Sequence, residues 1–485
     1  MTVRVRIAPS PTGYLHVGTA RAALYNWLFA QGRNGVFILR SDDTDSERNE
    51  PAYQEDIVSS LRWLGLDWDE GLEVGGPHAP YQQSLRFDRY REVASDLLAR
   101  GAAYYSFATP EQLDEFRREA QAAGRTPAYD GRFRVDAEVA AARVAAGEQV
   151  PIRLAVPRPG STAFVDAVRD EVTFDHNQVD DFVILRSDGS PTYHLASTVD
   201  DVDFGITHVM RGEDLLSSTP KHIILTEAMG AKPPVYAHLA LLMGPDGKKL
   251  SKRHGHTALN AYRADGILPE AMVNYLALLG WSPGEDETVV SLADMVARFR
   301  LEDVTKNATI FDNDKLEWMN GVYIRELSVD DFVARVRPLV EAHLGRALDP
   351  AELTQLTAIA PHVQERAKRL TEVAGQVAFI FGDVEYDEAS WEKVMTKPEA
   401  PIAVAAAAAG LATLDDWSTP GIEATLRNML EETELSARKG FQPLRVAVTG
   451  STVSPPLFES IEVLGRDATL ARLGAAVARM GDALI

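Results

Sequence analysis

The chain has 485 residues, no cysteine and a formal net charge of −22, from 49 lysines and arginines against 71 aspartates and glutamates. This length predicts several domains, and the lack of cysteine excludes disulfides, thiolate nucleophiles and cysteine-type zinc sites. No apolar run is long enough to cross a bilayer and the N-terminus has no signal-peptide segment, so we expect a cytoplasmic protein without membrane contact. The negative charge disfavours indiscriminate binding to nucleic acid, although a local basic footprint can still bind it.

The first forty residues predict a strand, a helix and a second strand. Residues 3–7 alternate between apolar side chains and arginine, which is typical of a strand, and apolar residues then recur at helical spacing over 20–28. "VFIL" (36–39) reads as a strand buried on both faces. This order predicts a Rossmann-like, doubly wound parallel sheet that binds its ligands at the strand ends.

The α/β pattern is interrupted from about residue 95 to residue 185. An Ala/Arg/Glu-rich stretch (109–149) favours helix, and the proline-punctuated segment "VPIRLAVPRPGSTAFV" favours short strands. The α/β pattern resumes at "FVILRSDG", at "ITHVMRG" and at a helix with Thr219 as its N-cap and Pro220 in its first turn. Beyond about residue 260 amphipathic helices dominate, and we interpret "AVAAAAAGLATL" as packed helix. We therefore expect an α/β fold whose sheet is split by an α+β insertion and followed by an all-helical region.

Residues 8–20, "APSPTGYLHVGTA", break the backbone between the first strand and the first helix. A helix N-terminus after such a turn offers free N–H groups to a phosphate. His16 can donate to a phosphate oxygen, and Gly18 lets a nucleotide approach the backbone. The plainer interpretation is that His16 only caps the helix while Pro9 and Pro11 shape a loop. Both interpretations stay open at this point.

A second candidate segment, "GPDGKKLSKRHG" (244–255), concentrates four cations between glycines. Such a loop can close over a triphosphate and offset charge on departing pyrophosphate. A solvated charged turn is the alternative, but Leu250 and Ser251 in its middle favour a shaped loop. Neither the dinucleotide fingerprint nor the Walker pattern occurs, so a nucleotide would have to be bound by a different motif.

Taken together, these segments resemble the class I aminoacyl-tRNA synthetases, and further motifs narrow the resemblance. The motifs are "RIAPSPTGYLHVGTAR", "DDTD", "YHLASTVDD", "RGEDLLSSTP" and "KKLSKRHGHTAL", and they are similar to those of the bacterial glutamyl-tRNA synthetase family. Scattered similarity, such as "WMNGVYIRE" and "TGSTVSPPLFES", extends over essentially the whole chain.

The resemblance implies that glutamate attacks the α-phosphate of Mg-ATP, and that a ribose hydroxyl of tRNA-Glu then takes the glutamyl group. No protein nucleophile is needed. The catalytic residues it implies are His16, Gly18, Lys249 and Lys252, and the ATP-binding set adds Thr19, Asp214, Ser251 and Arg253. The glutamate-binding set it implies is Arg6, Ala8, Ser10, Asp42, Tyr193, Ser197 and Arg211. Among these, Arg6 and Tyr193 would bind the side-chain carboxylate, and Ser10 with Asp42 would face the ammonium group.

The sequence departs from the family pattern at two of these positions. The family has Glu-Asp-Thr-Asp where this chain has "DDTD", so Asp42 is one methylene shorter than the usual acid. Ser197 replaces a typical asparagine and loses an amide that could reach the α-carboxylate. We expect the activity to survive with a raised KM for glutamate.

The resemblance also assigns tRNA-binding residues and domain roles. The tRNA-binding residues are Arg48 near the acceptor end and His362, Arg445, Ser454, Leu457 and Phe458 at the anticodon; core packing is the alternative for Leu457 and Phe458. The expected domains are a catalytic first half (1–95), an acceptor-stem insertion (96–185), a catalytic second half (186–240), a lysine-loop stem-contact domain (241–325) and two helical anticodon-binding subdomains (326–380 and 381–485). We expect a monomer, no zinc and no other bound metal.

Four other functions remain open at this stage. A related enzyme that glutamylates a modified tRNA base lacks the helical third, and a non-discriminating synthetase also charges tRNA-Gln. A Rossmann-type nucleotidylyltransferase would not need the helical region. A non-enzymatic tRNA-binding protein has no reason to keep both phosphate-handling segments.

Overall fold

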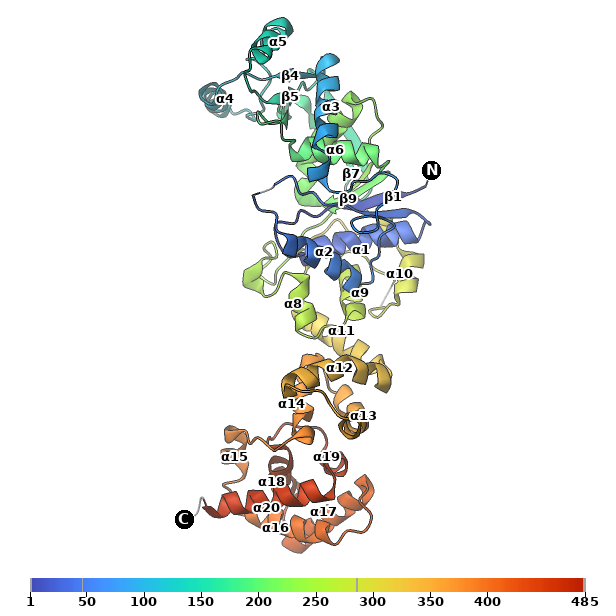
Figure 1. Ribbon diagram of the computed structural model, residues 1–485, viewed down its shortest axis with the longest axis vertical. Helices are drawn as coiled ribbons and strands as arrows, with labels where there is room; N and C mark the ends of the chain where they lie inside the picture. The colour runs from blue at the N-terminus through green and yellow to red at the C-terminus, as the bar shows by residue number, and fades with distance from the viewer. Residues whose placement is uncertain (1, 46, 285–286, 483–485) are drawn as a thin grey trace. The chain divides into compact units, whose positions relative to one another are not determined.

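The computed structural model describes residues 2–45, 47–284 and 287–482, and the chain falls into two compact units. The first unit comprises Met1–Arg263 and Met272–Asn313, and the second comprises Ala264–Ala271 and Asp314–Ile485. Figure 1 labels many of the helices and strands of both.

The N-terminal segment forms the βαβ unit that the sequence predicts. β1 (Arg4–Ile7) and β2 (Val36–Leu39) pair in parallel, and β3 (Glu70–Gly71) pairs in parallel with β2. The crossover helix α1 (Val17–Gln31) is buried along most of its length, and α2 (Pro51–Trp63) follows β2 (Figure 1). Helix α1 therefore covers the sheet and presents its N-terminus at the carboxyl end of β1.

The second half of the parallel sheet lies beside β1. β9 (His208–Gly212) and β10 (Val235–Leu239) pair in parallel, and the N–H of Thr207 donates to the carbonyl of Arg4 at 2.9 Å. The chain thus runs from β1 to β2 on one side, while β9 and β10 lie on the other. This reversal of strand order opens a crevice at the carboxyl ends of the strands. The Rossmann-like fold with a helical C-terminal region is confirmed.

Two helices of this second half differ from the sequence prediction. α6 (Tyr193–Asp203) was not predicted, because its buried positions include polar residues such as Ser197, Asp200 and Asp201, so it has no apolar stripe. The expected N-cap of α7 (Thr219–Ala228) is wrong by one residue. Ser218 holds the N-cap position, and the hydroxyl of Thr219 instead accepts a hydrogen bond from Arg211.

The insertion contains an antiparallel sheet and a hairpin. β4 (Ala103–Tyr105), β5 (Ile152–Leu154) and β8 (Val183–Leu185) form the sheet, and β6 (Ser161–Asp166) pairs with β7 (Asp170–Asp175). Its helices are α4 (Pro110–Ala122) and α5 (Ala137–Ala145), and α3 (Phe87–Ala99) precedes it. The strand in "FVILRSDG" therefore belongs to the insertion and does not resume the parallel sheet. A short apolar run does not reveal which sheet it joins.

Short elements follow β10, and most of their residues belong to the first unit. β11 (Leu242–Met243) pairs in parallel with β12 (Thr309–Ile310), a strand that was not predicted in this mainly helical part. The helices here are α8 (Leu259–Ala264), α9 (Pro269–Leu278) and α10 (Leu292–Arg298). In the ranges described above, no helix is long and apolar enough to cross a membrane.

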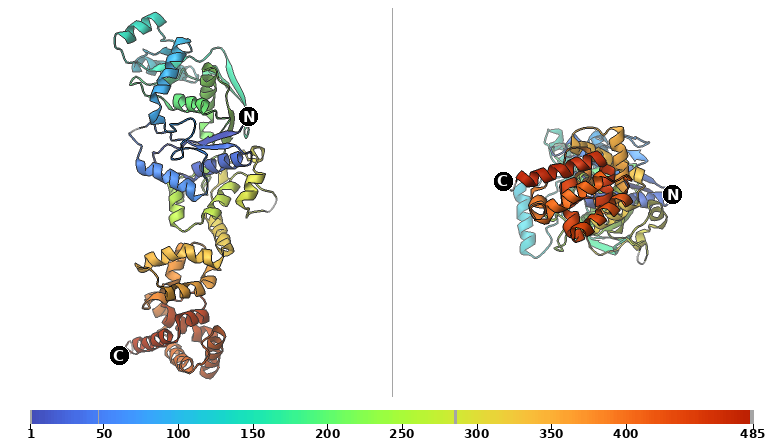
Figure 2. Two further views of the ribbon diagram at one scale, coloured as in Figure 1. Left: turned by 45° about the vertical axis from the view of Figure 1, so that its right-hand side comes forward. Right: turned by 90° about the horizontal axis from the view of Figure 1, so that it is seen from below.

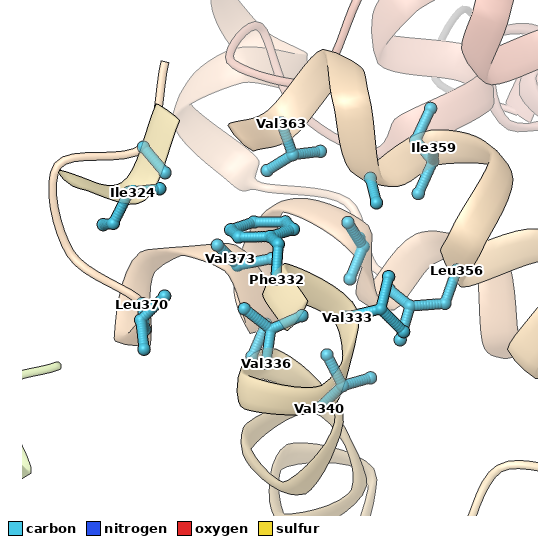
Figure 3. Close-up of a cluster of buried hydrophobic side chains, with 14 of the residues drawn as sticks. Ile324, Phe332, Val333, Val336, Val340, Leu356, Ile359, Val363, Leu370 and Val373 are labelled. Atoms are coloured by element: carbon cyan, nitrogen blue, oxygen red, sulfur yellow. The ribbon is translucent and has the colours of Figure 1, made fainter. Parts of the chain in front are cut away.

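The second unit contains helices around two apolar cores. The first core is built by α11 (Asn313–Glu326), α12 (Val329–Leu344), α13 (Pro350–Gln364) and α14 (Thr371–Val377). Figure 3 shows Phe332 among Val336, Val363 and Val373, all buried. The second core is built by α15 (Glu388–Val394), α16 (Glu399–Ala412), α17 (Thr419–Thr433), α18 (Ala437–Thr449), α19 (Leu457–Leu464) and α20 (Arg466–Asp482) (Figure 2). The alanine-rich segment is α16, so the prediction of packed helix there is confirmed.

Candidate active site

A cavity of about 590 Å³ opens at the carboxyl ends of β1, β9 and β10. Eleven residues singled out in the sequence line it: Arg6, Ala8, Ser10, His16, Gly18, Thr19, Asp42, Tyr193, Arg211, Asp214 and Lys249. The strand ends supply the arginines, the N-terminus of α1 supplies His16 to Thr19, and the loop after β11 supplies Lys249. The structure therefore brings the segments 8–20 and 244–255 to one cavity.

His16 is the N-cap of α1, and its imidazole accepts a backbone hydrogen bond. Its Nδ1 accepts from the N–H of Gly18 at 3.0 Å. Burial and the charge of Lys249 lower the pKa of His16. Because Nδ1 is an acceptor here, the neutral ring carries its proton on Nε2. The capping and phosphate-donor interpretations are thus compatible, since capping leaves Nε2–H as a donor.

Gly18 leaves little room for a side chain beside that imidazole. A Cβ at this position would lie 3.3 Å from Nδ1 of His16. A larger residue would therefore press on the ring that it helps to orient, in addition to narrowing the cavity.

The lysine loop is a shaped turn with exposed charges. The N–H of Gly244 donates to the carbonyl of Lys248 at 2.7 Å, and the N–H of Leu250 donates to that of Leu242 at 2.9 Å. Leu250 is buried, whereas Lys249 is largely exposed, with its Nζ 3.1 Å from Oδ2 of Asp214. An apolar anchor thus holds a loop whose ammonium group stays available at the mouth of the cavity.

The residues beyond Leu250 are bonded to the start of α1. The N–H of Val17 donates to the carbonyl of Thr257 at 2.9 Å, and the N–H of Leu259 donates to that of Leu15 at 2.8 Å. These bonds attach the segment that follows the lysine loop to the start of α1. Ser251 and Arg253 do not line the cavity, and the side chain of Lys252 lies outside the described atoms.

Two arginines at strand ends dominate the charge of the inner cavity. Arg6 is buried and binds Asp201 with two hydrogen bonds, Nε to Oδ1 at 3.0 Å and Nη2 to Oδ2 at 3.2 Å. Although burial raises the pKa of Asp201, the guanidinium groups of Arg6 and Arg40 outweigh it and hold this pKa below its usual value. Asp201 therefore stays ionised and fixes the orientation of Arg6.

Arg211 is held in place from three directions. Its Nη2 donates to the hydroxyl of Thr219 at 2.9 Å, its Nε donates to Nε2 of His238 at 3.2 Å, and its Nη1 lies 3.3 Å from the hydroxyl of Tyr193. Nδ1 of His238 in turn contacts Oδ2 of Asp166 at 2.6 Å. The first two contacts restrict the guanidinium, and the contact with Tyr193 links it to another residue of the cavity.

Arg40, which sequence reasoning missed, connects the two positions that depart from the family pattern. Its side chain is fully buried and binds Asp42 through Nε to Oδ1 at 2.6 Å and Nη2 to Oδ2 at 3.0 Å. Nη2 also lies 3.2 Å from the hydroxyl of Ser197, and Nη1 binds Asp201 at 2.9 Å. Ser197 is buried and does not line the cavity. The only sequence signal for Arg40 is its place directly after a buried strand.

The expected tRNA-binding residues are distributed over several elements. Arg48 is exposed and pairs with Asp45 at 2.5 Å. Nη1 of Arg445 donates to the hydroxyl of Ser454 at 2.5 Å and to the carbonyl of Pro455 at 2.6 Å. Leu457 is buried in the second helical core, which supports core packing for this residue, whereas Phe458 is half-buried and packs edge-on against Phe441. His362 is half-buried near the end of α13.

Comparisons with known proteins cover almost the whole chain. Residues 2–318 match the family described as tRNA synthetases class I (E and Q), catalytic domain, and residues 331–477 match the anticodon binding domain. The chain is 44% identical over 475 residues to a glutamate–tRNA ligase of Moorella thermoacetica (97% of each chain). It is 46% identical over 483 residues to that of Dehalococcoides mccartyi strain BAV1 (99% of this chain, 98% of the relative). The structure of a glutamate tRNA ligase from Elizabethkingia meningosepticum, in complex with its amino acid, superposes with a TM-score of 0.88 at 34% identity, covering 99% of this chain and 100% of that one.

Proposed function

Because the chain belongs to the class I tRNA synthetases for glutamate and glutamine, we propose that it uses ATP to attach L-glutamate to tRNA-Glu. The observation that carries this proposal is the single cavity in which a helix N-terminus, a lysine loop and two arginines meet. These groups suit a nucleotide triphosphate on one side and a dicarboxylic amino acid on the other.

The first step forms glutamyl adenylate. An oxygen of the α-carboxylate of glutamate forms a bond to the α-phosphorus of ATP, and the bond from that phosphorus to the bridging oxygen breaks, so pyrophosphate leaves with the electron pair. Nε2–H of His16 and the N-terminal N–H groups of α1 donate to phosphate oxygens that gain charge. Lys249 offsets the charge of the departing pyrophosphate. Positioning and charge stabilisation thus account for the chemistry.

The second step transfers the glutamyl group to tRNA. The oxygen of a ribose hydroxyl at the acceptor end forms a bond to the activated carbonyl carbon, and the bond from that carbon to the bridging oxygen breaks, so AMP leaves with this oxygen and the electron pair while the hydroxyl proton is released to solvent. The residues of this chain hold the adenylate in place during the attack. Because the nucleophile comes from the tRNA, the reaction does not require a cysteine, and the chain has none.

Glutamate recognition rests on Arg6, Arg211 and Tyr193 for the carboxylates. Among the described residues, Nη1 of Arg6 has no hydrogen-bond partner, so it is available to a carboxylate oxygen. The ordered guanidinium of Arg211 supplies a second donor. Ser10 and Asp42 line the same cavity and provide oxygen atoms for the ammonium group.

Magnesium enters with the nucleotide in this proposal. The carboxylates lining the cavity are Asp42 and Asp214, and each is already paired, with Arg40 and Lys249 respectively. The ATP phosphates would therefore be its main ligands, and the ion would offset phosphate charge. The monomeric state and the expected domain boundaries stay predictions.

The other candidate functions are less well supported. The match to an anticodon binding domain over residues 331–477 disfavours both a nucleotidylyltransferase and the shorter enzyme that glutamylates a modified base. The meeting of both phosphate-handling segments at one cavity disfavours a tRNA-binding protein without activity. Charging of tRNA-Gln as well as tRNA-Glu remains the main alternative.

Charging of purified tRNA-Glu and tRNA-Gln with labelled glutamate tests the proposal. We expect ATP-dependent labelling of tRNA-Glu at a rate that exceeds that of tRNA-Gln. Equal labelling of both would favour the non-discriminating enzyme, and no labelling of either would contradict the proposed function.

A further inference from the structure

A second cavity, of about 500 Å³, lies in the second unit, in the part that contains α15, α16 and α18. It is bordered by Lys393 and Lys397 in and after α15, by Glu399 at the start of α16, and by Arg438 and Lys439 at the start of α18. Its remaining lining residues are Val394, Ser436, Gln442, Pro443 and Thr452. Nothing in the proposed chemistry uses this cavity.

The charge of this cavity is opposite in sign to that of the chain as a whole. Four cations face one carboxylate, although the chain carries a net charge of −22. Lys439 pairs with Glu399 at 3.5 Å, and the charge of Lys397 also acts on this carboxylate, whereas Lys393 and Arg438 form no ion pair among the described residues. Like charges repel one another when they gather without counter-charges, so the arrangement suits a bound anion.

The start of α18 adds backbone donors to these cations. Ser436 holds the N-cap position, but its hydroxyl makes no capping hydrogen bond. The first N–H of this helix with an intrahelical acceptor is that of Gly440, which donates to the carbonyl of Ser436 at 2.9 Å. The N–H groups before Gly440 therefore remain available at the positive end of the helix dipole.

One face of α18 connects the cavity to Arg445. Arg438, Gln442 and Arg445 follow one another at spacings of four and three residues, which places them along one side of the helix. Arg445 holds Ser454 and Pro455, in the segment expected to contact the anticodon. A nucleic acid whose bases meet Arg445 would therefore have its backbone within reach of the cavity.

From this arrangement we propose that the cavity formed by Lys393, Lys397, Arg438 and Lys439 binds backbone phosphates of the tRNA next to its anticodon bases. The inference rests on the proposed function. It explains how a strongly acidic chain gains affinity for a polyanion, because only the local charge at the footprint matters. Its contacts are independent of base sequence, so they add affinity without discriminating between tRNAs.

The test compares the full chain with the variant Lys393→Gln/Lys397→Gln/Arg438→Gln. We expect the KM for tRNA-Glu in charging to rise about tenfold at about 0.1 M salt, and the slope of log KM against log salt to fall by about 2 for three lost contacts. The KM values for ATP and glutamate at saturating tRNA should stay within twofold, because the cavity lies outside the proposed active site. An unchanged KM for tRNA and an unchanged salt slope would overturn the inference.

Two controls separate local from general charge effects. The variant Lys393→Arg/Lys397→Arg/Arg438→Lys keeps the charges and should behave like the parent. The variant Arg337→Gln/Lys368→Gln/Arg427→Gln removes three ion-paired cations at the surface elsewhere in the second unit and should shift the KM for tRNA less than threefold. An equal shift in this last variant would mean that net charge alone acts, which would also overturn the inference.

A further measurement identifies the occupant. Inorganic phosphate is titrated into the parent chain and into the variant Lys393→Gln/Lys397→Gln/Arg438→Gln. Tight phosphate binding that is lost in the variant, while its KM for tRNA equals that of the parent, would assign the cavity to a small anion and contradict the inference. A parent chain that charges no tRNA contradicts the proposed function instead, and direct tRNA binding to parent and variant would then still test the cavity.

Discussion

His16 combines a structural and a chemical contribution in one ring. Nδ1 caps α1 through Gly18, and the same bond leaves the proton on Nε2, the atom available to a phosphate. Asparagine also caps helices well but lacks the far nitrogen of the imidazole. We therefore expect His16→Asn to lower kcat about a hundredfold while the free energy of unfolding changes by less than about 0.5 kcal/mol. An unchanged kcat in His16→Asn would show that capping is the only role of His16.

The pH dependence of charging follows from the same ring. Burial, and to a smaller extent repulsion from the ammonium group of Lys249, lowers the pKa of His16. The neutral form that capping requires therefore dominates at pH 7. Protonation at lower pH removes the acceptor on Nδ1. We expect kcat to stay level from pH 8 down to about 6.5 and to fall below it, with this acid limb missing in His16→Asn. If kcat falls at low pH in both the parent and His16→Asn, a group other than His16 is responsible for the titration.

Asp42 is hydrogen-bonded to Arg40, and we expect this bonding to weaken the binding of glutamate. Both carboxylate oxygens of Asp42 already bind one guanidinium, and the shorter side chain keeps them close to it. Glutamate at this position would reach further toward the ammonium group of the substrate. We expect Asp42→Glu to lower the KM for glutamate about fivefold, or by about 1 kcal/mol, without changing the KM for ATP. An unchanged or higher KM for glutamate would show that the shorter acid does not weaken binding.

At the scale of elements, the β6–β7 hairpin contributes to the active site although it belongs to the insertion. Asp166 at the end of β6 binds His238 of β10, and His238 binds Arg211 of β9. Asp166 also accepts the N–H groups of Val168 and Arg169, which fixes its carboxylate. This chain of bonds makes Asp166 a positioning residue for Arg211.

Asp166→Asn tests this connection between elements. The amide binds His238 more weakly, so Arg211 is held less firmly, and we expect the KM for glutamate to rise about tenfold, with a smaller change in kcat. Asp170→Asn in the same hairpin removes only an exposed ion pair with Lys306 and serves as the matched control. Equal effects of the two substitutions would indicate a general disturbance of the hairpin.

Elements with one apolar face or a strong turn signal could be predicted from the sequence, and the others could not. The βαβ unit and α16 follow from periodicity and composition, which depend on neighbouring residues alone. The helix α6 buries Ser197, Asp200 and Asp201 against arginines distant in the sequence, so its polar residues conceal its burial. β8 resembles a parallel strand locally and pairs with β5 only through the tertiary fold.

At the scale of the whole molecule, the same limit applies to the candidate site. His16, Gly18 and Lys249 could be named from their motifs, and the structure brings them to one cavity. The network around Arg40 joins residues 40, 42, 197 and 201, a set whose contacts depend on the folding of separate segments. The charge of −22 likewise gave no sign of the basic cavity in the second unit, because a sum over the chain hides local clusters.

The central claim is that one cavity activates glutamate with ATP for transfer to tRNA. Exchange of labelled pyrophosphate into ATP, measured with glutamate in the presence and absence of tRNA-Glu, tests this claim most directly. The account predicts exchange that requires glutamate in the presence of tRNA-Glu, and that falls about a hundredfold in His16→Asn. No exchange with glutamate and tRNA present, or exchange that another amino acid supports equally well, would contradict it.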